Sequence, residues 1–97
     1  MSFNAGNINA TLADAVGDDD VLAEDLKRAF MDSAHRHLDM MTRARCDANW
    51  QISAWRLKGL SATFGMTQLV DLAEQAGVGA PGDPAVIREI KGALSAL

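Results

Sequence analysis

The 97-residue chain has a single cysteine, no tyrosine and no long apolar run. One cysteine, Cys46, cannot build a disulfide framework within the chain, and no partner base lies beside it, so an incidental thiol is favoured. No apolar run approaches the roughly 20 residues that span a bilayer. The amino-terminal run MSFNAGNINA lacks the basic start and apolar stretch of a signal peptide. The sequence therefore predicts a cytoplasmic protein.

Basic residues are also few, with nine Lys and Arg against thirteen Asp and Glu, and the net charge is -4. The scattered basic residues argue against nucleic acid and against an anionic membrane surface as partners. The chain has no phosphate-binding glycine loop and no dinucleotide motif, so no cofactor is expected. His35 and His37 are two apart and would not share a helix face, so no metal site is expected.

Strand signals are weak, because no stretch alternates strictly between apolar and polar residues. Ala, Leu, Met, Asp, Glu and Arg dominate instead, a mixture typical of helices. Helical spacing of apolar residues predicts helices over about 7–16, 21–45, 49–65 and 66–76, and a last one from residue 84. We expect an all-α fold, an antiparallel four-helix bundle with a short extra N-terminal helix. Residues 1–97 then form one domain, with a short segment over 1–17 and the bundle over 18–97.

Helix ends are marked by capping and turn residues. The acids Asp18 to Asp20 suit the start of the second helix, and residues 47–49 are interpreted as the turn after it. Gly65 suits a left-handed end of the third helix, and Gly77 is expected to end the fourth. Asp83 followed by Pro84 predicts the cap and first position of the last helix.

The spacing of apolar residues also predicts which face of each helix is buried. In the second helix it comprises Leu22, Leu26, Ala29, Phe30, Ser33, His37, Met40 and Ala44. In the third it comprises Trp50, Ala54, Leu57, Ser61 and Phe64, and in the last Val86, Ile87, Ile90, Leu94 and Leu97. His37 is therefore expected to be packed and hydrogen-bonded, whereas His35 is expected to be solvated.

The third helix carries a second apolar strip, about 120 to 180 degrees from its core face. The strip consists of Ile52, Trp55, Gly59 and Ala62, and Arg56 and Lys58 flank it. An apolar strip on an outward face needs an explanation. Either another element, such as the N-terminal helix, covers it, or it binds a partner. Trp and Arg are enriched at interface hot spots, which favours the partner slightly.

The run AWRLKGLSATFG over residues 54–65, followed by Leu69 and by Leu72-Ala73-Glu74, resembles the signature of histidine-containing phosphotransfer (HPt) domains. That signature reads Ala-His-x-Leu-Lys-Gly-Ser/Ala, with a glycine ten residues after the histidine and a Leu-rich helix beyond. The Ala, Leu, Lys and both glycines are in register here. The helix layout also resembles the family from about Asp18 to Leu97.

The resemblance places Trp55 where the family has its phosphate-accepting histidine. Indole nitrogen is only a donor and has no in-plane lone pair, so Trp55 cannot form a phosphoramidate. The resemblance implies that Lys58 would lie near the phosphoryl group and that Gly59 leaves room for the partner. It therefore implies no catalytic residue, and docking onto a receiver domain of a response regulator or hybrid histidine kinase. The expected docking residues are Ile52, Trp55, Arg56, Lys58, Gly59 and Ala62.

Two alternatives stay open at this point. The chain could be a working phosphotransfer protein that uses His35 or His37, or in which Trp55 is not the native residue. It could instead be a helical interaction module that dimerises through the strip of Ile52 and Trp55. The expected oligomeric state is a monomer or weak dimer, and no activity as an enzyme is expected.

Overall fold

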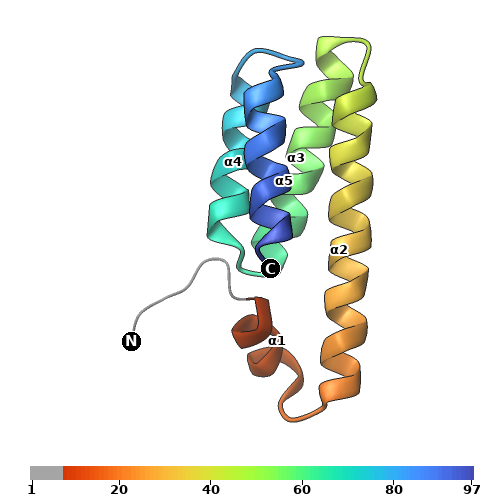
Figure 1. Cartoon of the computed structure of the whole chain (residues 1–97), viewed down its shortest axis with the longest axis vertical. Helices are drawn as coiled ribbons and strands as arrows, with labels where there is room; N and C mark the ends of the chain where they lie inside the picture. The colour runs from red at the N-terminus through yellow and green to blue at the C-terminus, as the bar shows by residue number, and fades with distance from the viewer. Residues whose placement is uncertain (1–7) are drawn as a thin grey trace.

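The computed structural model describes residues 8–97, which form five helices (Figure 1). These are α1 (Ile8–Val16), α2 (Asp20–Arg43), α3 (Asp47–Thr63), α4 (Thr67–Val78) and α5 (Pro84–Ser95). No strand occurs within this range, so the all-helical expectation is confirmed. Asn7, the first residue of the predicted N-terminal helix, lies outside the described residues.

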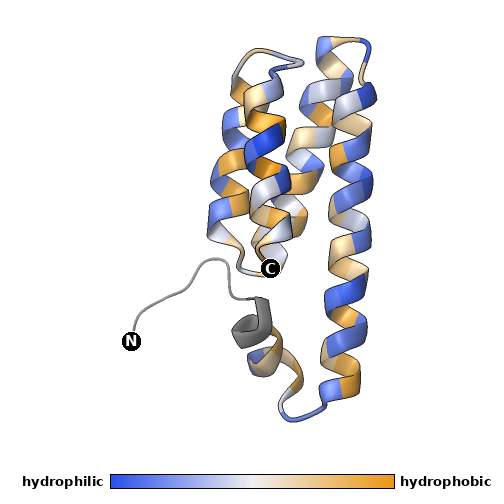
Figure 2. Ribbon diagram, in the orientation of Figure 1, coloured by the Kyte–Doolittle hydropathy of each residue, from blue (hydrophilic) through white to orange (hydrophobic). Residues whose placement is uncertain are grey.

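The helices α2 to α5 lie side by side, and each runs opposite to the one before it (Figure 1). α3 packs against α2 and α4, and α5 packs against α4 and α2, whereas the backbones of α3 and α5 are farther apart. The backbone of α1 lies close to α2 alone, beside the amino-terminal half of α2, which extends beyond the other helices (Figure 1). Apolar residues recur among polar ones along each helix, as helices with one buried face require (Figure 2).

Three predicted helix ends are confirmed. Asp19 caps α2, its Oδ1 accepting a hydrogen bond from the Leu22 amide at 2.9 Å. Asp83 caps α5 in the same way, accepting from the Ala85 amide at 2.9 Å. Gly65 follows α3 with a φ of 69°, the left-handed conformation that glycine adopts without strain.

Two predicted helix ends are wrong. Residues 47–49, expected as a turn, form the first turn of α3. Asp and Asn favour both turns and helix starts, because their side chains bond nearby backbone amides in either case. α4 does not end at Gly77 but continues through it to Val78.

The core faces of α3 and α5 are confirmed, whereas that of α2 is partly wrong. Trp50, Ala54, Leu57 and Ser61 of α3 are buried, and the half-buried Phe64 ring lies 4.9 Å from Phe30. α5 buries Val86, Ile87, Ile90 and Leu94. On α2 the expected core residues Leu22, Ala29 and Met40 are exposed, and the buried residues are Phe30, Ala34, Leu38 and Met41. The buried stripe starts only at Phe30 because the first turns of α2 have α1 as their sole neighbour.

No helix within residues 8–97 is both long enough and apolar enough to cross a membrane.

Candidate functional site

The predicted outward strip of α3 is exposed. Ile52 is 47% exposed, Trp55 is 36% exposed, and Gly59 and Ala62 also face solvent. The flanking Arg56 is exposed, and Lys58 is half-buried. The backbone of α1 lies beside α2 and not beside α3, so the N-terminal helix does not cover the strip within the described residues. Partner binding by these six residues stays a prediction.

The Trp55 ring does not stand free in solvent but lies against α4. A Cβ atom built on Gly77 would come within 2.6 Å of two carbons of the ring, so the indole occupies the space that any other residue would need. The Lys58 ammonium lies 5.2 Å from the ring centroid, within reach of a cation–π interaction. The same ammonium pairs with the Glu74 carboxylate at 3.1 Å. Trp55, Lys58, Glu74 and Gly77, here called the Trp55 cluster, thus join α3 to α4.

Two further side chains of α3 bind the end of α4. The indole Nε1 of Trp50 donates to the Ala76 carbonyl oxygen at 2.7 Å, and Nε2 of Gln51 donates to the Gly77 carbonyl oxygen at 3.3 Å. The last carbonyls of a helix have no partner within the helix, so donors from elsewhere stabilise its end. Gly77 is thus a helical position of α4 at which side chains of α3 pack closely against the backbone.

Replacing Gly77 with alanine is expected to push the Trp55 ring outward and leave stability nearly unchanged. The new methyl collides with a movable side chain, and the loss of ring packing is offset by about 0.5–1 kcal/mol from replacing a helical glycine. Acrylamide quenching in a Trp50→Phe background reads the exposure of Trp55 alone. Gly92→Ala is the matched control, because nothing lies within 4 Å of a Cβ there. Unchanged quenching in Gly77→Ala would contradict the assigned ring position.

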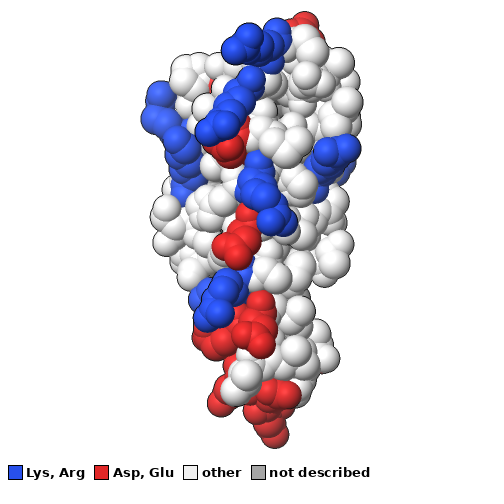
Figure 3. All heavy atoms as spheres, turned by 90° about the vertical axis from the view of Figure 1, so that its right-hand side faces the viewer, with Lys and Arg blue, Asp and Glu red and all other residues white. Residues whose placement is uncertain are grey.

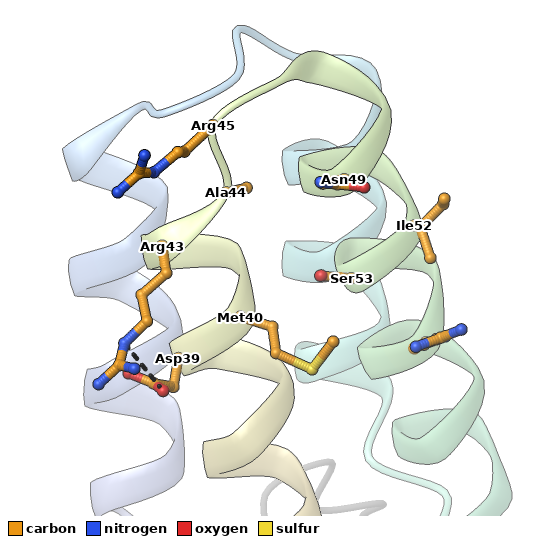
Figure 4. A pocket seen from close by; sticks show the side chains of 9 residues that line it. Asp39, Met40, Arg43, Ala44, Arg45, Asn49, Ile52 and Ser53 are labelled. Carbon is orange, nitrogen blue, oxygen red and sulfur yellow. Dashed lines mark ion pairs between the residues drawn. The ribbon is translucent and has the colours of Figure 1, made fainter.

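A groove between the carboxyl end of α2 and the first half of α3 lies beside the strip. Its volume is about 580 Å³. In Figure 4, Met40 reaches from α2 toward α3, and Asn49 and Ser53 of α3 point into the space between the helices. The complete lining, here called the α2–α3 groove, is Asp39, Met40, Arg43, Ala44, Arg45, Asn49, Ile52, Ser53 and Arg56.

The groove combines apolar residues with an excess of positive charge. Arg43 pairs with Asp39 at 3.3 Å, on the α2 side in Figure 4. Arg45 and Arg56 have no carboxylate within 4.0 Å in the part of the chain that is described. The groove was not predicted, because it forms between two helices and the pattern of one helix does not show what lies opposite it. The sequence feature that indicates the groove is an apolar residue, Met40, about one turn before Arg43 and Arg45.

His37 is half-buried on α2, as predicted, but it is not hydrogen-bonded as expected. Its Nδ1 is buried and has no partner among the described residues. Burial, together with the charges of Arg56 and Arg36, lowers the pKa of the imidazole below 6.5. A phosphate acceptor needs a lone pair on one ring nitrogen while the other holds the proton. The tautomer with a lone pair on Nε2 carries its proton on Nδ1, where it would find no acceptor among the described residues. That tautomer is therefore disfavoured.

The free energy of unfolding is expected to fall as the pH drops below about 6.5, in part through His37. Because the pKa of His37 is lowered in the folded state, the unfolded chain takes up the proton first as the pH falls. The contribution of His37 to the free energy of unfolding is therefore full above about pH 6.5 and declines as the pH falls toward the folded-state pKa. Urea unfolding between pH 7.5 and pH 5 measures the decline. His37→Gln should flatten it, whereas His35→Gln, at an exposed position of the same helix, should not. Equal slopes in wild type and His37→Gln would contradict this.

Other chemistry has little basis within residues 8–97. Cys46 is an exposed free thiol at the N-cap of α3, and its side chain makes no capping hydrogen bond. No group of three His, Cys, Asp or Glu side chains in this range is arranged to hold a metal ion. Comparison of the chain with protein-family models, with curated proteins and with solved structures finds no match.

Proposed function

We propose that the chain is an HPt-like module that docks onto the receiver domain of a response regulator or hybrid histidine kinase without accepting phosphate. The fold in this proposal is an antiparallel four-helix bundle of α2 to α5 with α1 as the extra short helix. The pairwise packing of these helices and their alternating directions support it. The observation that carries the proposal is the accessible position of Trp55 in the middle of an apolar strip, with Lys58 and Gly59 beside it.

The chemistry of the strip fits a partner with a carboxylate at its centre. Ile52 and Trp55 offer apolar contact, and Arg56 and Lys58 offer positive charge on either side. A receiver domain presents its phosphorylatable Asp at the docking face. Lys58 already binds a carboxylate, that of Glu74, so docking exchanges one carboxylate for another. Gly59 has no atom within 4 Å of a built Cβ, so open space lies above it for the partner.

The affinity for a receiver is expected to fall about 30-fold or more in Trp55→Ala, a loss of about 2 kcal/mol. The reason is that a large ring in the centre of an interface contributes most of the buried apolar area. Isothermal titration with receiver domains from the same organism measures it. Ala62→Ser should lower the affinity less, since it changes one small side chain at the end of the strip. Equal affinity of wild type and Trp55→Ala would count against the proposal.

A second experiment separates docking from phosphotransfer. Wild-type chain mixed with phosphorylated receivers should acquire no acid-labile phosphate, because Trp55 has no acceptor lone pair and His37 is disfavoured. Label that disappears in His35→Gln or His37→Gln would show a working phosphotransfer protein instead. Absence of both label and binding would leave the receiver proposal without support.

A further inference from the structure

One end of the molecule's long axis carries a concentration of acidic side chains. The end with the α2–α3 groove carries Arg43, Arg45 and Arg56, with Asp39 as the one acid of the groove. The opposite end, where α1 turns into α2, is acidic; Figure 3 shows red side chains gathered there, whereas blue and red side chains alternate above. Its exposed acids, here called the acidic corner, are Asp14, Asp18, Asp19, Asp20, Glu24 and Asp25.

Each of these two patches also holds exposed apolar side chains. In the acidic corner Val21 is 74% exposed and Leu22 is 44% exposed. In the groove Met40 is 44% exposed, and Ile52 lies on the α3 side of the groove (Figure 4). Exposed apolar patches that are rimmed by polar residues mark protein interaction sites. The two patches therefore match in both respects, apolar centre to apolar centre and positive charge to negative charge.

The two patches cannot meet within one chain. They lie at opposite ends of α2, whose 24 residues span about 36 Å at 1.5 Å per residue. The long dimension of the molecule is 43 Å. Only two separate copies can bring a groove and an acidic corner together.

We propose that the α2–α3 groove binds the acidic corner of a second copy of this chain, head to tail. Val21 and Leu22 of one copy would contact Met40 and Ile52 of the next, with acids of the corner facing the arginines. Because the contact joins two different patches, an open assembly keeps one free groove and one free corner at its ends. It can therefore grow into longer chains or close into a ring. The contact also covers Ile52 and Arg56, so a copy bound there competes with any other partner of the strip. The proposal does not depend on receiver binding.

Sedimentation equilibrium of the purified chain tests the proposal without any other protein. At low salt the average mass should rise above 10.3 kDa as the concentration increases. At about 0.5 M salt it should return toward the monomer, because the Debye length falls to a few ångströms and exposed charges are screened. A mass of one chain at all concentrations at low salt would overturn the proposal.

Charge reversal identifies the two patches. Arg45→Glu/Arg56→Glu and Asp18→Lys/Glu24→Lys should each weaken self-association at least about tenfold, because like charges then face each other. Arg88→Glu/Lys91→Glu, on the exposed face of α5, has the same net charge as the groove variant and should associate like wild type. Circular dichroism checks that all variants keep their helix content. Wild-type association in the groove variant would overturn the assignment.

Mixing the two reversed variants is the decisive arm. In the mixture, the unchanged acidic corner of the groove variant faces the unchanged basic groove of the corner variant. The reversed groove likewise faces the reversed corner. Association should return toward the wild-type level in the mixture, although each variant alone associates only weakly. No recovery on mixing would overturn the pairing of groove and corner.

Discussion

Replacing Trp50 with alanine is expected to lower the free energy of unfolding by about 3–5 kcal/mol, the usual loss for removing a large aromatic ring from a core. Trp50 is buried where α3 faces α4, and its indole also holds the end of α4 through the bond to the Ala76 carbonyl. The substitution therefore leaves a cavity and an unpaired buried carbonyl together. Urea unfolding followed by circular dichroism measures the loss.

Trp50→Phe separates the two contributions. Phenylalanine keeps much of the apolar volume but has no donor, so the Ala76 carbonyl oxygen is left unpaired, at a cost of about 1–3 kcal/mol. The exposed Trp55→Phe serves as the matched control and should cost much less. A Trp50→Ala variant that unfolds at the same urea concentration as wild type would contradict the assigned role.

Replacing Trp55 with histidine is expected to turn the chain from one that carries no phosphate into a phosphate acceptor. In the proposed complex, the phosphoryl group would pass from the aspartate oxygen of the receiver to an imidazole nitrogen, which has the lone pair that indole lacks. Imidazole is smaller than indole and fits in the space beside Gly77. Lys58 and Gly59 are already in place beside it. Acid-labile label on the variant after mixing with phosphorylated receiver is the measurement.

The controls for this gain keep the site and change only its chemistry. Trp55→Phe should bind the receiver and stay unlabelled, because its ring has no nitrogen. Trp55→His/Lys58→Ala should be labelled more slowly, because the positive charge beside the phosphoryl group is gone. A Trp55→His chain that binds the receiver tightly but never acquires label would contradict the proposed placement of position 55.

Sequence patterns predicted the features of this fold that depend on local chemistry. Asp83 with Pro84 marked the start of α5, and Gly65 marked the end of α3, because capping and positive φ are properties of one or two residues. The exposed strip on α3 followed from helical geometry alone, since Trp50, Ala54 and Leu57 set the direction of the buried face. What the strip binds does not follow from its geometry.

The errors arose where a distant segment decides the outcome. Gly77 was interpreted as the end of a helix, yet α4 continues through it, and the Trp55 ring fills the space where a Cβ atom would lie. A glycine within an apolar helical pattern can signal such packing, but the sequence does not say which ring fills the space. The core face of α2 was misplaced for a similar reason. Its apolar residues recur on more than one side, and only the positions of α1, α3 and α5 determine which are buried.

The extension of α2 beyond α3, α4 and α5 divides that helix into two parts of unequal local stability. Between Phe30 and Met41 one face of the helix is buried in the core, comprising Phe30, Ala34, Leu38 and Met41, so we expect backbone amides there to be released only when the whole domain unfolds. The turns before Phe30 have α1 as their one helical neighbour, and, among the side chains that the structure describes, these two segments join the core only through Leu12, Ala23 and Leu26. We therefore expect the hydrogen bonds of this amino-terminal part to open more readily than those of the bundle.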